Sequence, residues 1–234
     1  MMAMKKGEIE DILKVEDIDK VGIISLEDWK DKPVYEKSVK LLPGAKSVII
    51  LALEILPETI RHTTPQRIEG EMVMQNFYER NKELVNGRLD WETYKLVKRL
   101  HKNGYKGLPL TASMSPYDLR YMQPALAYKE AAALAGMGTT GWHSMLLTPD
   151  YGARIRLACV ITDAPIPPST DTVQYYPCPE CGGACIKICP VKAIKKPKGK
   201  ESSNVDKYAC NNYINAAGGC AQCLKVCPAG KQLK

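Results

Sequence analysis

The sequence predicts a mixed α/β or α+β fold over residues 1–165, followed by a small metal-binding region, and three observations predict it. Residues 46–53 contain the run Ser-Val-Ile-Ile-Leu-Ala-Leu, whose continuous apolar and β-branched character is typical of a strand buried on both faces. Residues 69–103 repeat apolar side chains at helical spacing. Eight of the nine cysteines lie between Cys178 and Cys227. Strands and helices mixed in this way predict a layered domain beside the cysteine-rich segment.

The other elements follow from local signals along the chain. An amphipathic helix is expected over residues 6–14, and an alanine-rich helix over 125–135 that ends at Gly136. The long helix is expected to break at Gly87. Strands are expected over residues 21–26, 46–53, 144–147 and 154–162. A Pro-Asp-Tyr-Gly turn joins the last two strands, which predicts a hairpin.

Cys159 stands apart from the other cysteines, inside the last of these strands. It shares one face of that strand with Ile155, Leu157 and Ile161, because side chains alternate between the two faces of a strand. We therefore expect Cys159 to be a buried core thiol.

Length and composition limit the class of protein. The chain has 234 residues, 45% of them hydrophobic, which suits one ordinary domain and a smaller one. The proline-rich stretch 165–168 reads as a linker, so the predicted domains span 1–168 and 169–234. No run of about 18 apolar residues and no secretory signal is present, which predicts a cytoplasmic protein away from membranes. Cysteines crowded together in a reducing compartment indicate metal binding.

The cysteines form two runs that each end in Cys-Pro. Two-cluster bacterial ferredoxins have C-x2-C-x2-C-x3-C-P runs, and the last cysteine of each run ligates the other [4Fe–4S] cluster. We therefore assign four cysteines to each of two [4Fe–4S] clusters. The first set is Cys178, Cys181, Cys185 and Cys227, and the second is Cys189, Cys210, Cys220 and Cys223.

Two alternatives to this assignment stay open. Zinc ribbons use paired cysteines separated by about 15–20 residues, and four cysteines within the twelve residues 178–189 do not fit that spacing. The gap between Cys181 and Cys185 is one residue longer than in ferredoxins. The small residues of Gly182-Gly183-Ala184 can absorb it, or the spacing marks an unusual cluster.

The net charge of +7 lies in the cysteine-rich region. Residues 178–234 hold ten lysines and three acids, a balance of 10 − 3 = +7. These lysines compensate the negative charge of thiolate-bound clusters, or they form a patch for nucleic acid. The candidate patch consists of Lys192, Lys195, Lys196, Lys198 and Lys200.

Residues 129–165 carry a resemblance to a known family. The segment Ala-Gly-Met-Gly-Thr-Thr-Gly-Trp-His at 135–143 and Thr-Asp-Ala-Pro at 162–165 resemble the region before the double-cluster segment in epoxyqueuosine reductases and reductive dehalogenases. The resemblance implies a nitroreductase-like core that carries cobalamin, with flavin as the alternative, beside a ferredoxin-like domain with two [4Fe–4S] clusters. It also implies an anaerobic oxidoreductase that receives electrons from a donor such as ferredoxin or flavodoxin.

The resemblance also assigns candidate site residues. Cofactor contacts are expected from the glycine turn and the two residues after it, against the alternative of a plain helix cap and loop. These residues are Gly138, Thr139, Thr140, Gly141, Trp142 and His143. The family's catalytic acid has no counterpart in register, since Met122-Gln123-Pro124 stands near that place. Tyr121 is therefore the candidate proton donor, and Asp118 a weaker one. Tyr121 as a packing residue is the alternative.

Two further departures shape the functional hypotheses. The lysine that the family carries after the glycine turn is replaced by Trp142, and the family's tRNA-binding helical repeats are absent, so tRNA is expected to be an unlikely partner. The first hypothesis is a cobalamin-dependent reductase acting on an unknown small-molecule substrate. The second is an electron-transfer or cofactor-handling protein that serves a partner redox enzyme. The third is recognition of nucleic acid by the lysine patch.

Overall fold

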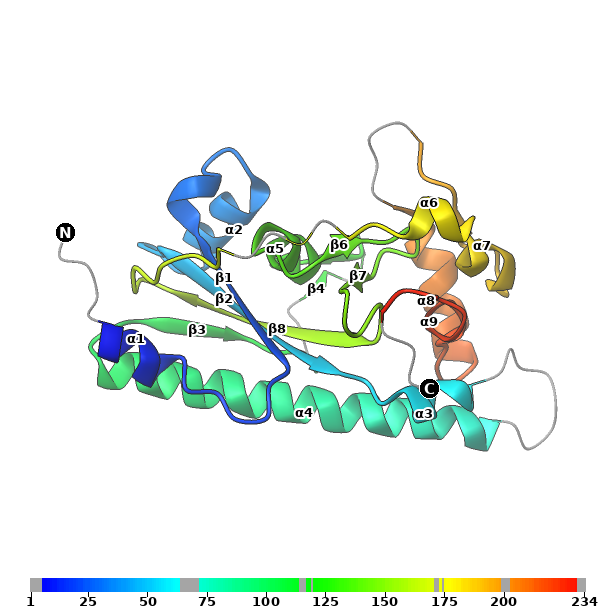
Figure 1. Cartoon of the computed structure of the whole chain (residues 1–234), viewed down its shortest axis with the longest axis horizontal. Coiled ribbons are helices and arrows are strands. Elements are labelled where there is room, and N and C mark those ends of the chain that lie inside the picture. Colours follow the sequence, from blue (N-terminus) through cyan, green and yellow to red (C-terminus); the bar gives the residue numbers. More distant parts are fainter. Residues whose placement is uncertain are drawn as a thin grey trace. The chain divides into compact units, whose positions relative to one another are not determined.

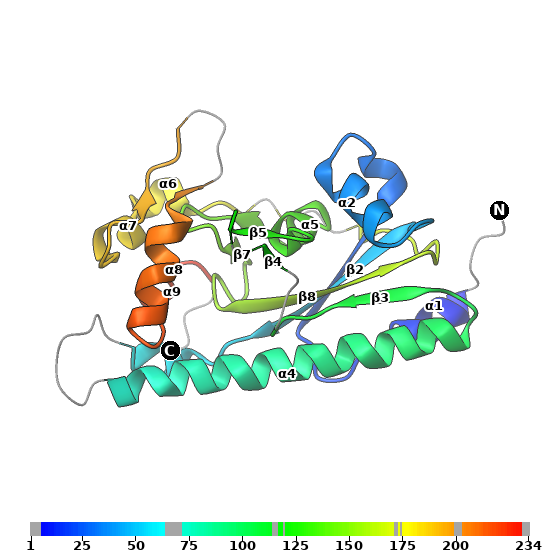
Figure 2. The same cartoon turned by 180° about the vertical axis from the view of Figure 1, so that it is seen from behind.

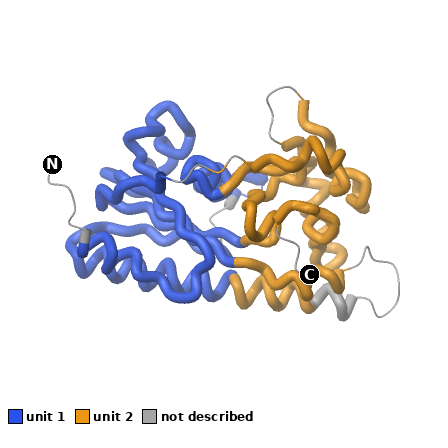
Figure 3. The backbone as a smooth tube through the Cα atoms, in the orientation of Figure 1, with its two compact units in different colours: residues 1–53, 86–137, 156–172 blue, residues 54–85, 138–155, 173–234 orange. Residues whose placement is uncertain are grey.

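The computed structural model of the chain forms two compact units that interleave along the sequence (Figure 3). The described residues are 6–63, 72–113, 117–118, 120–170, 173, 175–198 and 203–230. The first unit consists of residues 1–53, 86–137 and 156–172. The second consists of residues 54–85, 138–155 and 173–234. The predicted mixed fold is confirmed, whereas the nitroreductase-like and ferredoxin-like domains remain predictions.

A four-stranded sheet is the centre of the first unit, with strand order β1-β2-β8-β3. The strands are β1 (Lys20–Ser25), β2 (Ser47–Glu54), β8 (Ile155–Thr162) and β3 (Gly107–Leu110). Strand β1 pairs antiparallel with β2, and β3 pairs antiparallel with β8, where Leu110 lies opposite Cys159. At the end of β2 and β8, the Lys46 N–H donates to the Thr162 carbonyl at 2.8 Å.

The two central strands are buried on both faces. In β2 the side chains of residues 47–52 are buried, which explains the continuous apolar run seen in the sequence. In β8 every residue from 157 to 162 is buried, so the face opposite Cys159 also packs into the core. The prediction for Cys159 is confirmed, since the residue is 0% exposed. Burial raises the pKa of this thiol, which keeps it protonated and unreactive.

Helices cover both faces of this sheet (Figures 1 and 2). Helix α4 (Met72–Lys102) runs along one face, where Val97 and Leu100 pack close to Gly107 of β3. Helices α2 (Pro33–Leu41) and α5 (Tyr128–Leu134) lie on the other face. The short helix α1 (Lys6–Ile12) is tied to α4 by a hydrogen bond from the Arg99 Nε to the Ile12 carbonyl.

The described part of the first unit also contains a 3-10 turn and a small hairpin. The 3-10 turn η1 (Leu26–Trp29) follows β1, and a hairpin joins β4 (Tyr117–Asp118) to β5 (Gln123–Pro124). The predicted helix over 125–135 begins three residues late, at Tyr128, and Gly136 follows it with the expected positive φ of 74°.

The predicted break at Gly87 is wrong, because α4 is continuous from Met72 to Lys102. A glycine inside a helix weakens it without breaking it when the helix is held by packing. Here Leu89, Leu96 and Leu100 are fully buried and anchor the helix beyond Gly87.

The second unit contains short elements around a small core. Apart from residues 72–85 of α4, its elements are α3 (Pro57–Arg61), β6 (Thr139–Thr140), β7 (Leu146–Leu147), α6 (Cys178–Cys181), α7 (Ala184–Ile188), β9 (Ile194–Lys195), β10 (Asn204–Val205), α8 (Lys207–Ala216) and α9 (Gln222–Lys225). Ile60, Tyr78 and Leu224 belong to its core. The predicted hairpin of 144–147 with 154–162 is wrong, since β7 pairs with β6.

Within the described residues, no helix combines the length and the apolar character that a membrane crossing requires.

Replacing Gly87 by alanine should stabilise the protein. Nothing lies within 4 Å of the added Cβ, and Gly87 has no positive φ, so the change only removes conformational freedom from the unfolded chain. We expect the free energy of unfolding to rise by about 0.5–1 kcal/mol in urea denaturation. A loss of stability would contradict a continuous helix at this position.

Candidate metal centres

Three cysteines of the first set are brought together by two short helices and a pair of glycines. Helix α6 carries Cys178 and Cys181, and α7 carries Cys185. Gly182 and Gly183, with φ angles of 65° and 83°, reverse the chain between these helices. Side chains other than glycine rarely adopt such backbone, so the Gly-Gly pair accommodates the extra residue between Cys181 and Cys185.

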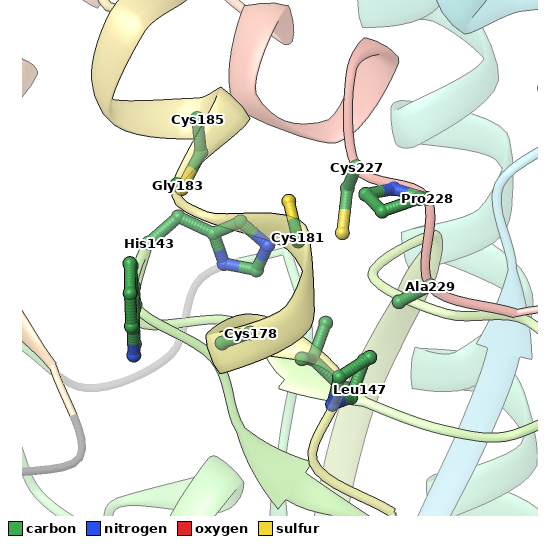
Figure 4. Close-up of a pocket in the computed structure, with 11 residues that line it drawn as sticks. His143, Leu147, Cys178, Cys181, Gly183, Cys185, Cys227, Pro228 and Ala229 are labelled. Atoms are coloured by element: carbon green, nitrogen blue, oxygen red, sulfur yellow. The ribbon is translucent and has the colours of Figure 1, made fainter.

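Cys227 joins these three from the far end of the sequence. It follows α9 and lines the same pocket as Cys178, Cys181 and Cys185 (Figure 4). The remaining lining residues are Trp142, His143, Leu147, Pro177, Gly183, Pro228 and Ala229. The pocket is therefore a space bordered by four thiols and otherwise largely apolar.

The titration of this first set reflects its crowding. Burial raises the pKa of Cys185 to about 11, and the neighbouring Cys178, Cys227 and Cys181 add to the rise. Burial likewise raises the pKa of Cys227, and Cys178 and Cys181 add to it, against Arg154. Four thiolates so close together repel one another, and bound iron would reverse this by supplying positive charge.

The other four cysteines form an equivalent group. Burial raises the pKa of Cys210, with further contributions from Cys220, Cys189 and Asp206. Burial also raises the pKa of Cys223, to which Cys220, Cys210, Cys185 and Cys189 contribute in that order. Cys189 thus interacts with the second group, although the sequence places it in the first run.

The two runs are therefore crossed in space. Cys227 interacts with Cys178 and Cys181, while Cys189 interacts with Cys210 and Cys220. The last cysteine of each run thus lies near cysteines of the other run, and the crossed ligation that the ferredoxin-type spacing predicts remains a prediction. Cys223 packs against the apolar cores beside both groups, which links them.

The four thiols of the first group border a pocket. Among the described residues, no three His, Cys, Asp or Glu side chains lie close enough together to hold a single metal ion. A tetrahedral zinc site needs thiolates within about 2.3 Å of one ion, hence close to one another. The donor set, all thiols in two groups of four, fits a larger iron–sulfur core.

Backbone N–H groups are aimed at several of these sulfur atoms. The Ala193 N–H donates to the Cys189 Sγ at 3.3 Å. Hydrogen bonds from the backbones of Trp142, Gln222 and Ala229 lower the pKa of Cys178, Cys220 and Cys227 against the larger effect of burial. Such donors favour the thiolate form that binds metal, and they are among the groups that set the reduction potential of a cluster.

The glycine turn supports the first group of cysteines. Thr139 and Thr140 form β6 and pair with β7, and the Thr139 hydroxyl donates to the Tyr175 carbonyl. A Cβ on Gly138 would lie 2.1 Å from the carbonyl oxygen of Leu147. The backbone of the glycine turn thus packs directly against strand β7. A contact between this turn and a corrin or flavin remains a prediction.

Trp142 and His143, the last two candidates for cofactor contact, line the cysteine pocket. The indole packs with Cys185 in a buried cluster, and its Nε1–H donates to the Tyr176 hydroxyl at 2.9 Å. His143 is 4% exposed, and its Nδ1 accepts a hydrogen bond from the Met145 N–H at 3.2 Å. A neutral His143 therefore carries its proton on Nε2.

Asp118 ends strand β4 of the hairpin in the first unit, and Tyr121 lies in the loop that follows. The Tyr121 ring is 65% exposed, and the Arg120 guanidinium lies 5.5 Å from its centroid. Hydrogen bonds from Arg120 lower the pKa of Asp118 despite some desolvation. Asp118 is therefore ionised at neutral pH and is poorly suited to donate a proton, whereas the side chain of Tyr121 is exposed to solvent.

Sequence relatives of the chain are reductases of two kinds, although no family model matches it. The chain is 25% identical over 225 residues to an epoxyqueuosine reductase of Bacillus cereus, covering 86% of this chain and 53% of that protein. It is 30% identical over 222 residues to a tetrachloroethene reductive dehalogenase of Desulfitobacterium hafniense. That match covers 86% of this chain and 36% of the dehalogenase.

Solved structures of both kinds share the fold. An epoxyqueuosine reductase with a tRNA stem loop gives a TM-score of 0.59 at 19% identity, over 95% of this chain and 63% of that one. A reductive dehalogenase described as B12-dependent gives a TM-score of 0.63 at 18% identity. The match covers 92% of this chain and 30% of that one. The chain is therefore similar to epoxyqueuosine reductases and reductive dehalogenases in both sequence and fold. It spans about half the length of the epoxyqueuosine reductase relatives that it matches.

The neighbour with a bound tRNA stem loop bears on one expectation. The sequence argument made tRNA an unlikely partner of this chain, whereas a protein of the same fold holds a tRNA stem loop. That expectation is therefore weakened, and RNA remains an alternative partner in the experiments below.

A turn that the sequence does not connect with the cysteines holds the segment just after Cys227. A Cβ on Gly152 would lie 1.9 Å from the Ala229 carbonyl oxygen, and the Gly230 N–H donates to the Tyr175 hydroxyl at 2.8 Å. The Pro-Asp-Tyr-Gly turn thus fixes the segment just after Cys227. Its sequence carried a turn signal, but nothing in it indicated the partner.

Replacing Gly138 by alanine should disturb the first cysteine group. The added Cβ would overlap the Leu147 carbonyl, and backbone cannot move aside as a flexible side chain can. We expect a loss of about 2 kcal/mol or more in the free energy of unfolding, measured by urea denaturation. Gly87→Ala is the matched control, and equal stability of the two variants would contradict the close approach.

Proposed function

We propose that the chain is an iron–sulfur oxidoreductase that passes low-potential electrons through two [4Fe–4S] clusters to a cobalamin-type cofactor. The observation that carries the proposal is the crossed arrangement of eight cysteines in two groups of four. The reductase names of its sequence relatives support a redox role. Its substrate is proposed to be a small molecule, by analogy with the dehalogenase relatives.

The residues divide the proposed work between them. Cys178, Cys181, Cys185 and Cys227 would hold one cluster, and Cys189, Cys210, Cys220 and Cys223 the other. Trp142 and His143 shield the first cluster site from water with their buried rings. Exclusion of water and N–H donors to sulfur are two of the means by which a protein sets a cluster's potential.

The proposal of a cobalamin cofactor is supported by similarity in fold to a solved structure. One neighbour in fold is a reductive dehalogenase described as B12-dependent. Such a cofactor would supply the bond-breaking chemistry, and the protein would supply position and protons. Tyr121 is the proposed proton donor, because its phenol is accessible while Asp118 is held ionised by Arg120.

A second candidate function is electron transfer or cofactor handling for a partner redox enzyme. The ion pair of Asp118 with Arg120 at 3.0 Å favours it, since it leaves the hairpin without a ready carboxylic acid. The pocket described here is also bordered by cluster ligands and not by groups suited to a substrate.

Metal analysis of anaerobically purified protein separates these functions. We expect about eight iron atoms per chain, and a paramagnetic signal after reduction with dithionite. Added cob(II)alamin should change its visible spectrum if the reductase function holds. Clusters without any response to corrinoid would favour the electron-transfer function. Zinc, or no metal at all, would refute the proposal.

Pairs of cysteine variants test the crossed ligation. Cys178→Ala and Cys227→Ala should each remove one cluster, about half of the iron, because both remove ligands of the same cluster. The double variant of these two should lose no more than either single variant. The pair Cys178→Ala and Cys189→Ala should instead lose nearly all iron, measured together with the reduced spectrum.

The pattern of additivity decides between two arrangements. If each run held its own cluster, Cys178→Ala with Cys189→Ala would lose only half of the iron. Cys159→Ala is the matched control, because Cys159 lies in the core of the first unit and should leave the iron content unchanged.

A further inference from the structure

A basic surface lies on the strand that packs against Trp142 and Cys185 in the second unit. It consists of Lys192, Lys195 and Lys196, and we call it the β9 face. All three lysines are exposed, and among the described residues no acidic side chain forms an ion pair with any of them. The apolar Val191 beside them is 37% exposed.

The turn after Cys189 gives this face its position. Lys192 adopts a φ of 53°, and its N–H donates to the Cys189 carbonyl at 3.1 Å. The next residue, Ala193, donates its N–H to the Cys189 sulfur. The same tight turn therefore contacts a proposed cluster ligand with its backbone and directs a lysine to solvent.

Strand β9 separates the lysines from the cysteines by a single layer. Ile194 is buried and packs with Trp142 and Cys185, whereas Lys195 is exposed, as alternation along a strand requires. The Lys196 Nζ lies 5.8 Å from the centroid of the Trp142 ring. The indole thus contacts both the basic surface and the first cysteine group.

The positive charge of this surface favours a negatively charged partner. The +7 net charge of the whole chain equals the balance of residues 178–234 alone, so the other residues sum to zero. A basic patch with an apolar residue beside it matches a partner that presents acidic side chains around an apolar centre. RNA is also acidic, but the position of the face one layer from the cysteines favours a partner that delivers electrons.

We propose that the β9 face is the docking site of an acidic one-electron carrier protein of the flavodoxin or ferredoxin class. This inference rests on the proposed function, since it requires clusters in the cysteine groups. In the productive encounter the reduced carrier gives up one electron, which takes an oxidised [4Fe–4S] cluster from the 2+ to the 1+ state. No bond is made or broken, and the carrier leaves in its oxidised form.

Two charge-reversed proteins with the same net charge test the proposal. The first carries Lys192→Glu, Lys195→Glu and Lys196→Glu. The control carries Lys40→Glu, Lys98→Glu and Lys102→Glu, which change exposed lysines of the first unit. Each set changes the net charge from +7 to +1, because three reversals remove six charges. Iron content and the dithionite-reduced signal are measured first for both.

The readouts are the stopped-flow rate of cluster reduction by reduced flavodoxin and the dissociation constant of the complex. At low salt we expect the β9 variant to be slower by about tenfold or more and the control to change less than threefold. At about 1 M salt, where charges are screened beyond about 3 Å, the three proteins should become equal.

The outcomes separate this inference from the proposed function. Protein without iron would refute both. If both variants contain their clusters and the carrier reduces them at equal rates, the docking site alone would be refuted. A β9 variant that loses binding of an RNA stem loop while its reduction rate is unchanged would overturn the proposal in favour of nucleic acid.

Discussion

The second unit depends on the electrostatics of eight thiols held in two tight groups. Burial and mutual proximity raise the pKa of several of these cysteines, so the groups resist ionisation in the absence of metal. Backbone N–H groups directed at four of the sulfurs oppose this. A cationic iron core bound among these thiols would favour the thiolate forms that burial disfavours, and its binding would then be coupled to the folding of this unit.

Close approaches of backbone to backbone keep the ligands of the first group in place. The hairpin of β6 and β7 closes at Gly138, and the turn at Gly152 meets the chain just after Cys227. Trp142 fills the space between Gly183 and the cysteines, since a Cβ on Gly183 would lie 3.1 Å from the indole. Cysteines far apart in sequence are therefore brought together by the packing of the chain itself.

Local signals in the sequence predicted the individual elements better than their partners. The apolar run of β2 and the buried thiol of Cys159 could be predicted because they depend on composition and periodicity alone. The break at Gly87 and the hairpin of β7 with β8 were wrong, because tertiary packing decides whether a helix continues and which strand pairs with which. Crossed cluster ligation is predicted from the cysteine spacing and stays a prediction, whereas nothing in the sequence indicates the partner of Gly152.

The crossed arrangement has a consequence for the segment that carries the exposed lysines. Cys189 and Cys210 flank β9 and β10, and both belong to the second group. An iron core bound there would staple the two ends of this segment, as a disulfide does, and remove conformational entropy on the order of 3 kcal/mol from the unfolded chain. Without that core the two ends of the segment would be joined only through the chain, so the placement of the exposed lysines would depend on metal binding.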